Sequence, residues 1–230
     1  MRLLLLLLLS LMLSSCMPRL AYETQSPENK QEPFLIVDDP NDEIISVFKG
    51  AMSDGVLFAT LIADAGTEAG SSFYSFAVGK TIAEFNFPKS NKVFDSMLVY
   101  DRRMASLEWE ANIVKHFGKQ KDFELNFIIL GRWHLSPFDH FANVNVAFGE
   151  GLSYASEIPY YERIRWPKKS QLLNNMTFEF AVELPFIELE DISELTAVVR
   201  LHHRSGVFGL FNGVHGASNV VAFGLRARYF

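Results

Sequence analysis

The sequence has a single cysteine, Cys16, and no apolar stretch long enough to cross a membrane as a helix. A chain with one thiol forms no internal disulfide, so its stability has to come from a large core or a closed sheet. The longest apolar run, residues 3–13, is too short for a helical span. The chain has 27 acidic and 21 basic residues and no basic cluster interleaved with aromatics, which argues against a nucleic-acid surface.

The first residues have the pattern of an export signal. One arginine, the Leu-dominated run of residues 3–13 and two serines precede Cys16, as in a secretory signal peptide. The sequence Leu-Ser-Ser-Cys also resembles the bacterial lipobox, so we expect a signal peptide over residues 1–16 and a lipid anchor on Cys16. The alternative is ordinary cleavage nearby, for instance after Ala21. Residues 17–42 are polar and contain prolines, which is typical of a flexible N-terminal arm.

Strand-length segments fill most of the remaining chain, which we assign to one barrel domain over residues 43–230. Turn residues separate about eight such segments. They lie at residues 55–64, 72–86, 105–117, 122–133, 141–154, 171–184, 196–205 and 218–229. The 21 phenylalanines fall largely in these segments rather than in one continuous run, so the chain carries apolar surface without a helical span.

Polar and apolar side chains alternate along several of these segments. In residues 105–117, Leu107 and Trp109 alternate with Glu108 and Glu110. Successive side chains of a strand point to opposite faces, so the aromatics share one face and the carboxylates the other. Long strands with an apolar exterior and a narrow polar interior predict an all-β fold, an eight-stranded antiparallel outer-membrane β-barrel.

The lengths of the connections and the apolar segment near the chain end also favour an outer-membrane barrel. We place the short turn at residues 116–122 and the long polar loop at 155–170 on opposite rims, as in outer-membrane barrels. Residues 221–229 form an apolar face that resembles the terminal strand of those barrels. We therefore expect the bacterial outer membrane as the location. The alternative is a soluble lipocalin-like barrel, tethered by Cys16, whose apolar interior carries an apolar ligand.

Two candidate chemical groups, His203 and Ser205, lie on the apolar face of the segment 196–205. The preceding positions of the same period-two series are Ala197, Val199 and Leu201. A histidine and a hydroxyl that face lipid are costly and need a functional reason, such as a lipid ester. His202 has the opposite parity, and we assign it to a polar network inside the barrel rather than to catalysis.

These residues resemble the PagL family of outer-membrane lipid A 3-O-deacylases. The resemblance rests on a next-to-last strand that ends in His203-Arg204-Ser205 and on the aromatic terminal strand that follows. Residues 147–154 and 203–209 also resemble a set of related bacterial barrels. The likeness covers most of residues 72–229 and implies the removal of an ester-linked acyl chain from a lipid.

The resemblance implies a role for each site residue. Ser205 is the nucleophile and His203 the general base, and the family has a glutamate on the last strand that orients the imidazole. No Asp or Glu occurs between Gly206 and the end of this chain. Asn219, which shares the outer face of the terminal strand, or Glu150, an acid on another apolar face, is the candidate for that role.

For the oxyanion, the resemblance implies donors at Gly206, through its backbone N–H, and at Asn212. The sequence thus predicts an outer-membrane esterase that acts on lipopolysaccharide or phospholipid, with no cofactor, no metal and no nucleic-acid partner. The alternative is a non-catalytic outer-membrane barrel of the same fold with a structural or lipid-binding role.

Overall fold

The computed structural model describes residues 35–36, 43–53, 70–85, 105–135, 143–185, 187 and 190–229. They belong to one compact unit, Phe34–Phe230. The expected signal peptide, its Cys16 and nearly all of the expected N-terminal arm lie outside the described residues. Among the residues that the structure describes, no helix is long and apolar enough to cross a membrane.

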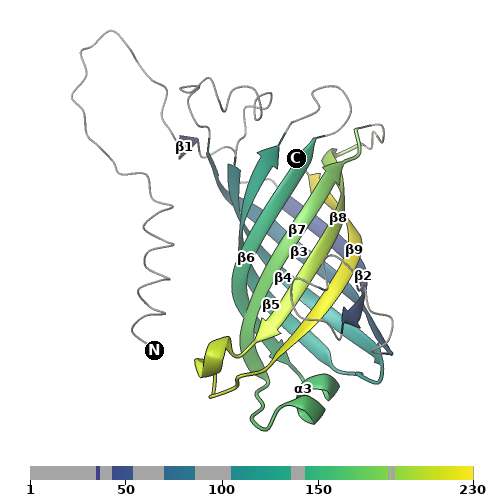
Figure 1. Cartoon of the computed structure of the whole chain (residues 1–230). Coiled ribbons are helices and arrows are strands. Elements are labelled where there is room, and N and C mark those ends of the chain that lie inside the picture. Colours follow the sequence, from purple (N-terminus) through teal and green to yellow (C-terminus); the bar gives the residue numbers. More distant parts are fainter. Residues whose placement is uncertain are drawn as a thin grey trace, which may run out of the picture. The chain divides into compact units, whose positions relative to one another are not determined.

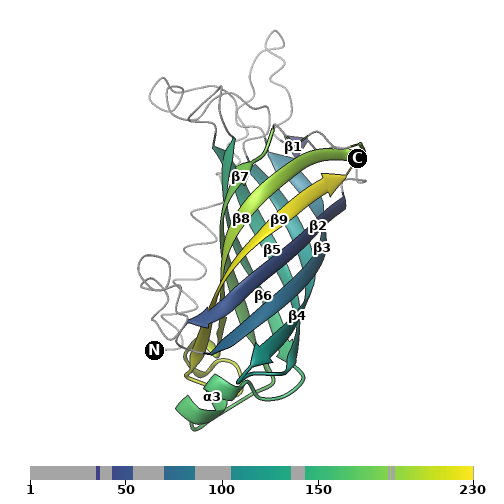
Figure 2. The ribbon, with the colours of Figure 1, turned by 90° about the vertical axis from the view of Figure 1, so that its right-hand side faces the viewer.

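Eight long strands form a closed antiparallel barrel, as the sequence predicts (Figures 1 and 2). The strands are β2 (Glu43–Ser53), β3 (Ser71–Phe85), β4 (Ala105–Gly118), β5 (Phe123–Leu135), β6 (Val144–Ala155), β7 (Leu172–Glu183), β8 (Ile192–Ser205) and β9 (Ala217–Tyr229). Each pairs with the next along the chain, and β9 pairs with β2 to close the barrel. A two-residue strand, β1 (Leu35–Ile36), adds to β3. The described connections include the helix α3 (Tyr160–Arg165) and the short 3-10 segment η2 (Val207–Gly209).

The first barrel strand differs from the sequence-based expectation. The predicted segment 55–64 lies outside the described residues, and β2 occupies Glu43–Ser53 instead. In β2 the inward side chains Ile44, Phe48 and Met52 are buried and apolar. The inner face also carries the buried Ser46, and the outer face carries the exposed Lys49, so β2 lacks the regular polar–apolar alternation that reveals the other strands.

The barrel has two distinct ends. We call the end that carries α3 the helix end, and the end at which β2 begins and β9 ends the terminal end (Figure 2). Both the short connection 119–122 and the long connection 156–171 lie at the helix end, so the assignment of these two loops to opposite rims is wrong. Successive connections of an antiparallel barrel alternate between its ends, and these two connections are two steps apart.

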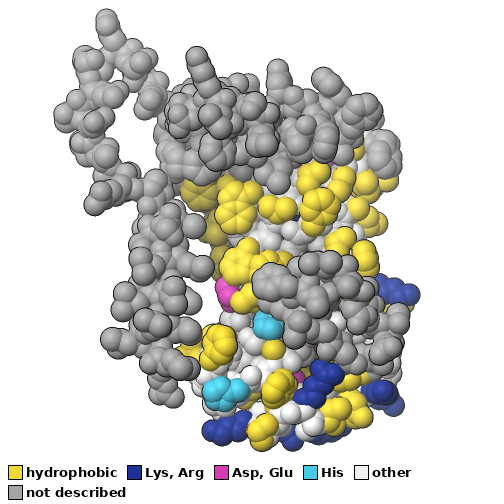
Figure 3. Space-filling view, viewed as in Figure 1, with side chains coloured by type: hydrophobic (Ala, Val, Ile, Leu, Met, Phe, Trp, Pro, Cys, Tyr) yellow, Lys and Arg dark blue, Asp and Glu magenta, His cyan; other side chains and the backbone are white. Residues whose placement is uncertain are grey.

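The outer wall is apolar and most of the interior is polar, apart from a buried apolar cluster that includes Phe48, Phe73 and Val220. Large hydrophobic side chains on alternate positions are exposed, including Phe76, Ile113, Phe127 and Phe223. Figure 3 shows hydrophobic side chains over the wall, with lysine and arginine gathered at the helix end. This arrangement is opposite to that of a soluble barrel, so the lipocalin-like alternative and its apolar ligand cavity do not fit the structure.

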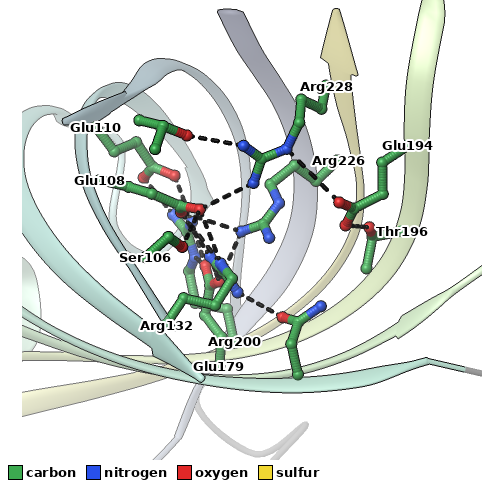
Figure 4. Close-up of polar contacts among 12 residues, drawn as sticks. Ser106, Glu108, Glu110, Arg132, Glu179, Glu194, Thr196, Arg200, Arg226 and Arg228 are labelled. Atoms are coloured by element: carbon green, nitrogen blue, oxygen red, sulfur yellow. Dashed lines mark hydrogen bonds and ion pairs between the residues drawn. The ribbon is translucent and has the colours of Figure 1, made fainter. Parts of the chain in front are cut away.

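Buried ion pairs fill much of the interior (Figure 4). Glu179 accepts hydrogen bonds from Arg132 Nη2 and Arg200 Nε, both at 2.7 Å. The other face of Arg132 donates through Nε to Glu108 at 3.1 Å, and Arg200 donates to both oxygens of Glu110 at 2.6 Å. Each of these charges is compensated, which a low-dielectric interior requires. The network ties together strands that are not neighbours in the sheet.

Candidate active site

The strands β8 and β9 bring His203, Ser205 and Asn219 together at the helix end of the barrel. The register of this pair places Asn219 directly opposite His203, and Ala217 opposite Ser205. All three site residues share the parity of outward-facing Phe223, whose side chain is 59% exposed. The expected outer-face position of all three residues therefore agrees with the strand geometry.

His203 and Asn219 form a short hydrogen bond. His203 Nδ1 lies 2.6 Å from Asn219 Oδ1. An amide oxygen only accepts, so Nδ1 carries the proton and donates to it. The tautomer thus set leaves the Nε2 lone pair of the imidazole free to accept a proton, which is the state that a general base requires.

Ser205 lies next to this pair on the same face of β8. The two side chains are separated by two residues along a strand, about 6.5–7 Å between Cα atoms. Ser205 and Asn219 are buried, at 8% and 7% exposure, and His203 is half-buried. No hydrogen bond joins Ser205 Oγ to the imidazole among the described residues. Such contacts are often long in enzymes without substrate.

Glu150 does not contact the imidazole. It lies on β6, and the register runs from Glu150 to Met176 on β7 and then to His203 on β8. Its carboxylate accepts a hydrogen bond from Asn174 Nδ2 at 2.8 Å. Of the two candidates for the orienting role, the structure brings Asn219 to His203 and leaves Glu150 two strands away.

Asn174 is a site residue that the sequence reasoning missed. It lies directly opposite Ser205 in the pairing of β7 with β8, on the outward face of β7. Its Nδ2 donates to Glu150 and to the backbone oxygen of Gly151, at 2.8 and 3.2 Å, while its Oδ1 is buried with no hydrogen-bond partner among the described residues. The sequence indicates that Asn174 faces outward, because Asn174 and the outward-facing Phe180 belong to the same period-two series of their strand.

The two expected oxyanion donors are engaged elsewhere. The backbone N–H of Gly206 donates to the Gly216 oxygen at 3.1 Å, so it does not point to an oxyanion beside Ser205. This correction follows from the fold of residues 206–216, whose ends pair across the loop. Asn212 is exposed and donates through Nδ2 to Ser170 Oγ at 2.8 Å, which joins this loop to the connection 156–171.

The connection that follows Ser205 is strained. Val207, Phe208 and Asn212 adopt φ values of 46°, 53° and 50°. This left-handed region is costly for residues other than glycine, above all for a β-branched residue, and strain of this kind concentrates at functional sites. Phe208 and Leu210 are about three-quarters exposed, at 75% and 74%, so the loop presents apolar side chains beside the site.

Arg204 lies on the inward face of β8, the strand that carries His203 and Ser205, and fixes that strand from inside the barrel. Its guanidinium donates to the carboxylate of Glu162 on α3 and to Ser153 Oγ at 3.1 Å. Ser218 Oγ also donates to Glu162, at 3.1 Å. Burial raises the pKa of Glu162 in spite of Arg204. These contacts hold α3 and the ends of β8 and β9 in one arrangement, which positions His203 and Asn219 on the opposite face.

No protein-family model and no curated protein matches the chain. Solved structures similar to it include the outer membrane enzyme PagL, at 12% identity and a TM-score of 0.51 over 81% of this chain and 98% of that one. The N-terminal β-barrel domain of Pseudomonas aeruginosa OprF has 10% identity and a TM-score of 0.42, over 83% and 98% of the two chains. The outer membrane protein OprG of Pseudomonas aeruginosa has 13% identity and a TM-score of 0.36, over 82% and 95%. With its apolar wall and polar interior, the chain is an eight-stranded β-barrel of the bacterial outer membrane.

Proposed function

We propose that the protein is an outer-membrane esterase that removes an acyl chain from a membrane lipid. Ser205 is the nucleophile, His203 the general base and Asn219 the residue that orients the imidazole. The observation that carries the proposal is the 2.6 Å contact between His203 Nδ1 and Asn219 Oδ1 on an outer wall that faces lipid. His203 is half-buried and Asn219 is buried there, and polar side chains on the lipid side of a barrel are costly unless they have a function.

The reaction follows the logic of an activated serine. Substrate binding brings Ser205 Oγ within reach of His203 Nε2, which takes the hydroxyl proton as Oγ attacks the ester carbonyl. The tetrahedral intermediate collapses, the bond to the alcohol oxygen breaks, and the imidazolium returns its proton to that oxygen. Water then attacks the acyl-serine with the same base, which releases a fatty acid and restores Ser205.

Two features support a lipid with an anionic head group as the substrate. Ser205 lies at the end of β8, close to the rim at which lipid head groups meet water. Basic side chains are exposed on the connections of this helix end (Figure 3). They are Lys119, Lys121, Arg163, Arg165, Lys168 and Lys169. Lipopolysaccharide and phospholipid both fit this charge, and the resemblance of the His-x-Ser strand to lipid A 3-O-deacylases favours lipid A.

Mass analysis of the lipid A and phospholipids of cells with and without the protein tests this proposal. Ser205→Ala and His203→Ala are expected to abolish deacylation to a similar degree, because a serine without its base is a poor nucleophile at neutral pH. Ser72→Ala is the matched control, since Ser72 is another outward-facing serine at the helix end of the barrel. Lipid deacylation by the Ser72→Ala variant is expected to equal that by the wild type. Identical lipids with and without the protein, and no ester hydrolysis by the purified barrel, refute the esterase.

The second candidate function is a non-catalytic lipid-binding barrel. It is favoured by the burial of Ser205 and by the engagement of the Gly206 N–H with Gly216. A fluorophosphonate probe, which reacts with activated serines, separates the two functions. Labelling of the wild type that is lost in Ser205→Ala and in His203→Ala supports the esterase, whereas equal labelling of all three supports the binding barrel.

A further inference from the structure

Two buried carboxylates inside the helix end of the barrel have no guanidinium or ammonium partner among the described residues. They are Asp122, which is 7% exposed, and Glu124, which is 5% exposed. The nearest arginines of the interior are bound to other acids, Arg200 to two interior glutamates and Arg204 to Glu162. A protonated His116, which hydrogen-bonds to Glu124 at 3.1 Å, supplies one positive charge for two carboxylates, and burying the remaining negative charge uncompensated is unfavourable. The arrangement therefore calls for a cation.

Two histidines face these carboxylates. His116 Nε2 lies 3.1 Å from Glu124 Oε1, and His202 Nε2 lies 3.7 Å from Glu124 Oε2. His202 is 7% exposed, and its Nε2 is buried with no hydrogen-bond partner in the described part of the chain. The separation of 3.7 Å is too long for a hydrogen bond. The contacts of the described residues therefore do not explain why this imidazole nitrogen is buried beside a carboxylate without a hydrogen bond.

The donor atoms converge on one place. One ligand atom each from His116, Asp122 and Glu124 lie within 4.8 Å of one another. The backbone N–H of His116 donates to the backbone oxygen of Asp122 at 3.1 Å, so the tight connection 119–122 folds Asp122 back onto the end of β4, and Gln120 Nε2 donates to the Asp122 carboxylate at 3.4 Å. A cavity of about 20 Å³ lies next to His116, Glu124 and His202, and its lining also includes Arg200 and apolar side chains such as Phe48.

We propose that His116, Asp122, Glu124 and His202 bind one divalent transition-metal ion, for which Zn²⁺ is the best match. Two imidazoles and two carboxylates form a donor set that suits zinc. Bonds of about 2.0–2.1 Å place the ligand atoms of a tetrahedral zinc about 3.3 Å apart. His116 Nε2 lies 3.1 Å from Oε1 of Glu124, and His202 Nε2 lies 3.7 Å from the other carboxylate oxygen, Oε2, so both imidazoles face the same carboxylate. The ion also neutralises the charge of the two carboxylates.

The site would connect parts of the barrel that are distant in the sheet. His116, Asp122 and Glu124 come from the junction of β4 and β5, whereas His202 comes from β8, which lies across the interior. His202 is the chain neighbour of His203, and its side chain points inward while that of His203 points outward. The ion therefore anchors from inside the strand segment that carries the proposed base. The metal site does not depend on the esterase proposal.

Metal titration of the full chain, purified in detergent without a histidine tag, tests the site. A chelator first removes any bound metal, and Zn²⁺ is then added. The wild type is expected to retain one Zn²⁺ per chain through gel filtration, as measured by elemental analysis. Bound Co²⁺ is expected to show the visible absorption of a tetrahedral site with nitrogen and oxygen ligands. His202→Gln and Glu124→Gln are each expected to weaken Zn²⁺ binding at least about 100-fold, the share of one ligand in a structural zinc site.

His215→Gln is the matched control, because His215 is an exposed histidine in the connection 206–216. It is expected to bind Zn²⁺ as the wild type does. Heat-modifiable gel mobility shows whether each variant has formed its barrel. The proposal is overturned if folded wild-type protein binds no stoichiometric Zn²⁺, or if folded His202→Gln binds it unchanged. The wild-type Co²⁺ spectrum decides the question even where a variant fails to fold.

Discussion

Replacement of Asn219 by aspartate tests the orienting contact most directly. Aspartate has the shape of asparagine, so one carboxylate oxygen takes the position that lies 2.6 Å from His203 Nδ1. A hydrogen bond between neutral groups contributes about 1 kcal/mol, and one to a charged group about 1.5–3 kcal/mol. The imidazole becomes charged in the transition state, so a carboxylate gains about 1–2 kcal/mol there, or roughly 5- to 30-fold in rate.

Asn219→Ala is the opposite perturbation. It removes the hydrogen bond to the developing imidazolium, worth about 1.5–3 kcal/mol, so the rate is expected to fall about 10- to 150-fold. The expected order of rates is therefore aspartate, asparagine, alanine. Because Asn219 is only 7% exposed, the aspartate is also expected to destabilise the barrel through the desolvation of its charge.

Ester hydrolysis by the purified barrel in detergent, at one pH and with each variant folded by gel mobility, measures these rates. Urea unfolding of the same samples measures the stability cost separately. An Asn219→Asp variant that is slower than Asn219→Ala, or an Asn219→Ala variant as fast as the wild type, would refute the assignment of Asn219 as the orienting residue.

Three further predictions concern the barrel and its anchor. Glu179→Ala is expected to lower the free energy of unfolding by about 3–5 kcal/mol, since Arg132 and Arg200 lose a buried counter-charge; an unchanged urea midpoint contradicts this. In Gly151→Ala the new Cβ would clash with the backbone oxygen of Phe127 on β5, so we expect loss of heat-modifiable mobility, and normal folding argues against so close an approach. Cys16→Ala is expected to remove acyl mass from the mature N-terminus while the barrel stays in the outer membrane; an unmodified N-terminus at Tyr22 in the wild type excludes the lipid anchor.

Seven of the eight barrel strands could be predicted because their two faces differ in polarity. Carboxylates such as Glu108 and Glu124 alternate with aromatics such as Trp109 and Phe123, and a narrow barrel needs that difference between inside and outside. β2 does not show it, because its inward face carries the apolar Ile44, Phe48 and Met52 beside Ser46. The end of the barrel at which each connection lies could also have been predicted, because successive connections alternate between the two ends and can be counted in the sequence.

The sequence predicts which face of its strand each residue of the candidate site occupies. It does not predict which residues lie directly opposite one another on neighbouring strands. Parity put Asn219 and His203 on the outer face, whereas their direct opposition depends on the length and shape of residues 206–216. The same loop engages the Gly206 N–H, which no local pattern reveals. His116 and His202 each have inward parity, but their approach to Glu124 depends on packing across the interior, between strands that are far apart in the chain.

The pairing of β2 with β9 has a consequence for the biogenesis of the protein. Glu43 at the beginning of the barrel lies opposite Tyr229 near the chain end, so the last strand has to be present before the ring of hydrogen bonds can close. Until then two strand edges remain open, and lipid offers no partner for their amides and carbonyls. The unfinished chain thus has no stable place in the bilayer, and insertion has to await the complete chain and depend on an agent that shields both edges until they meet.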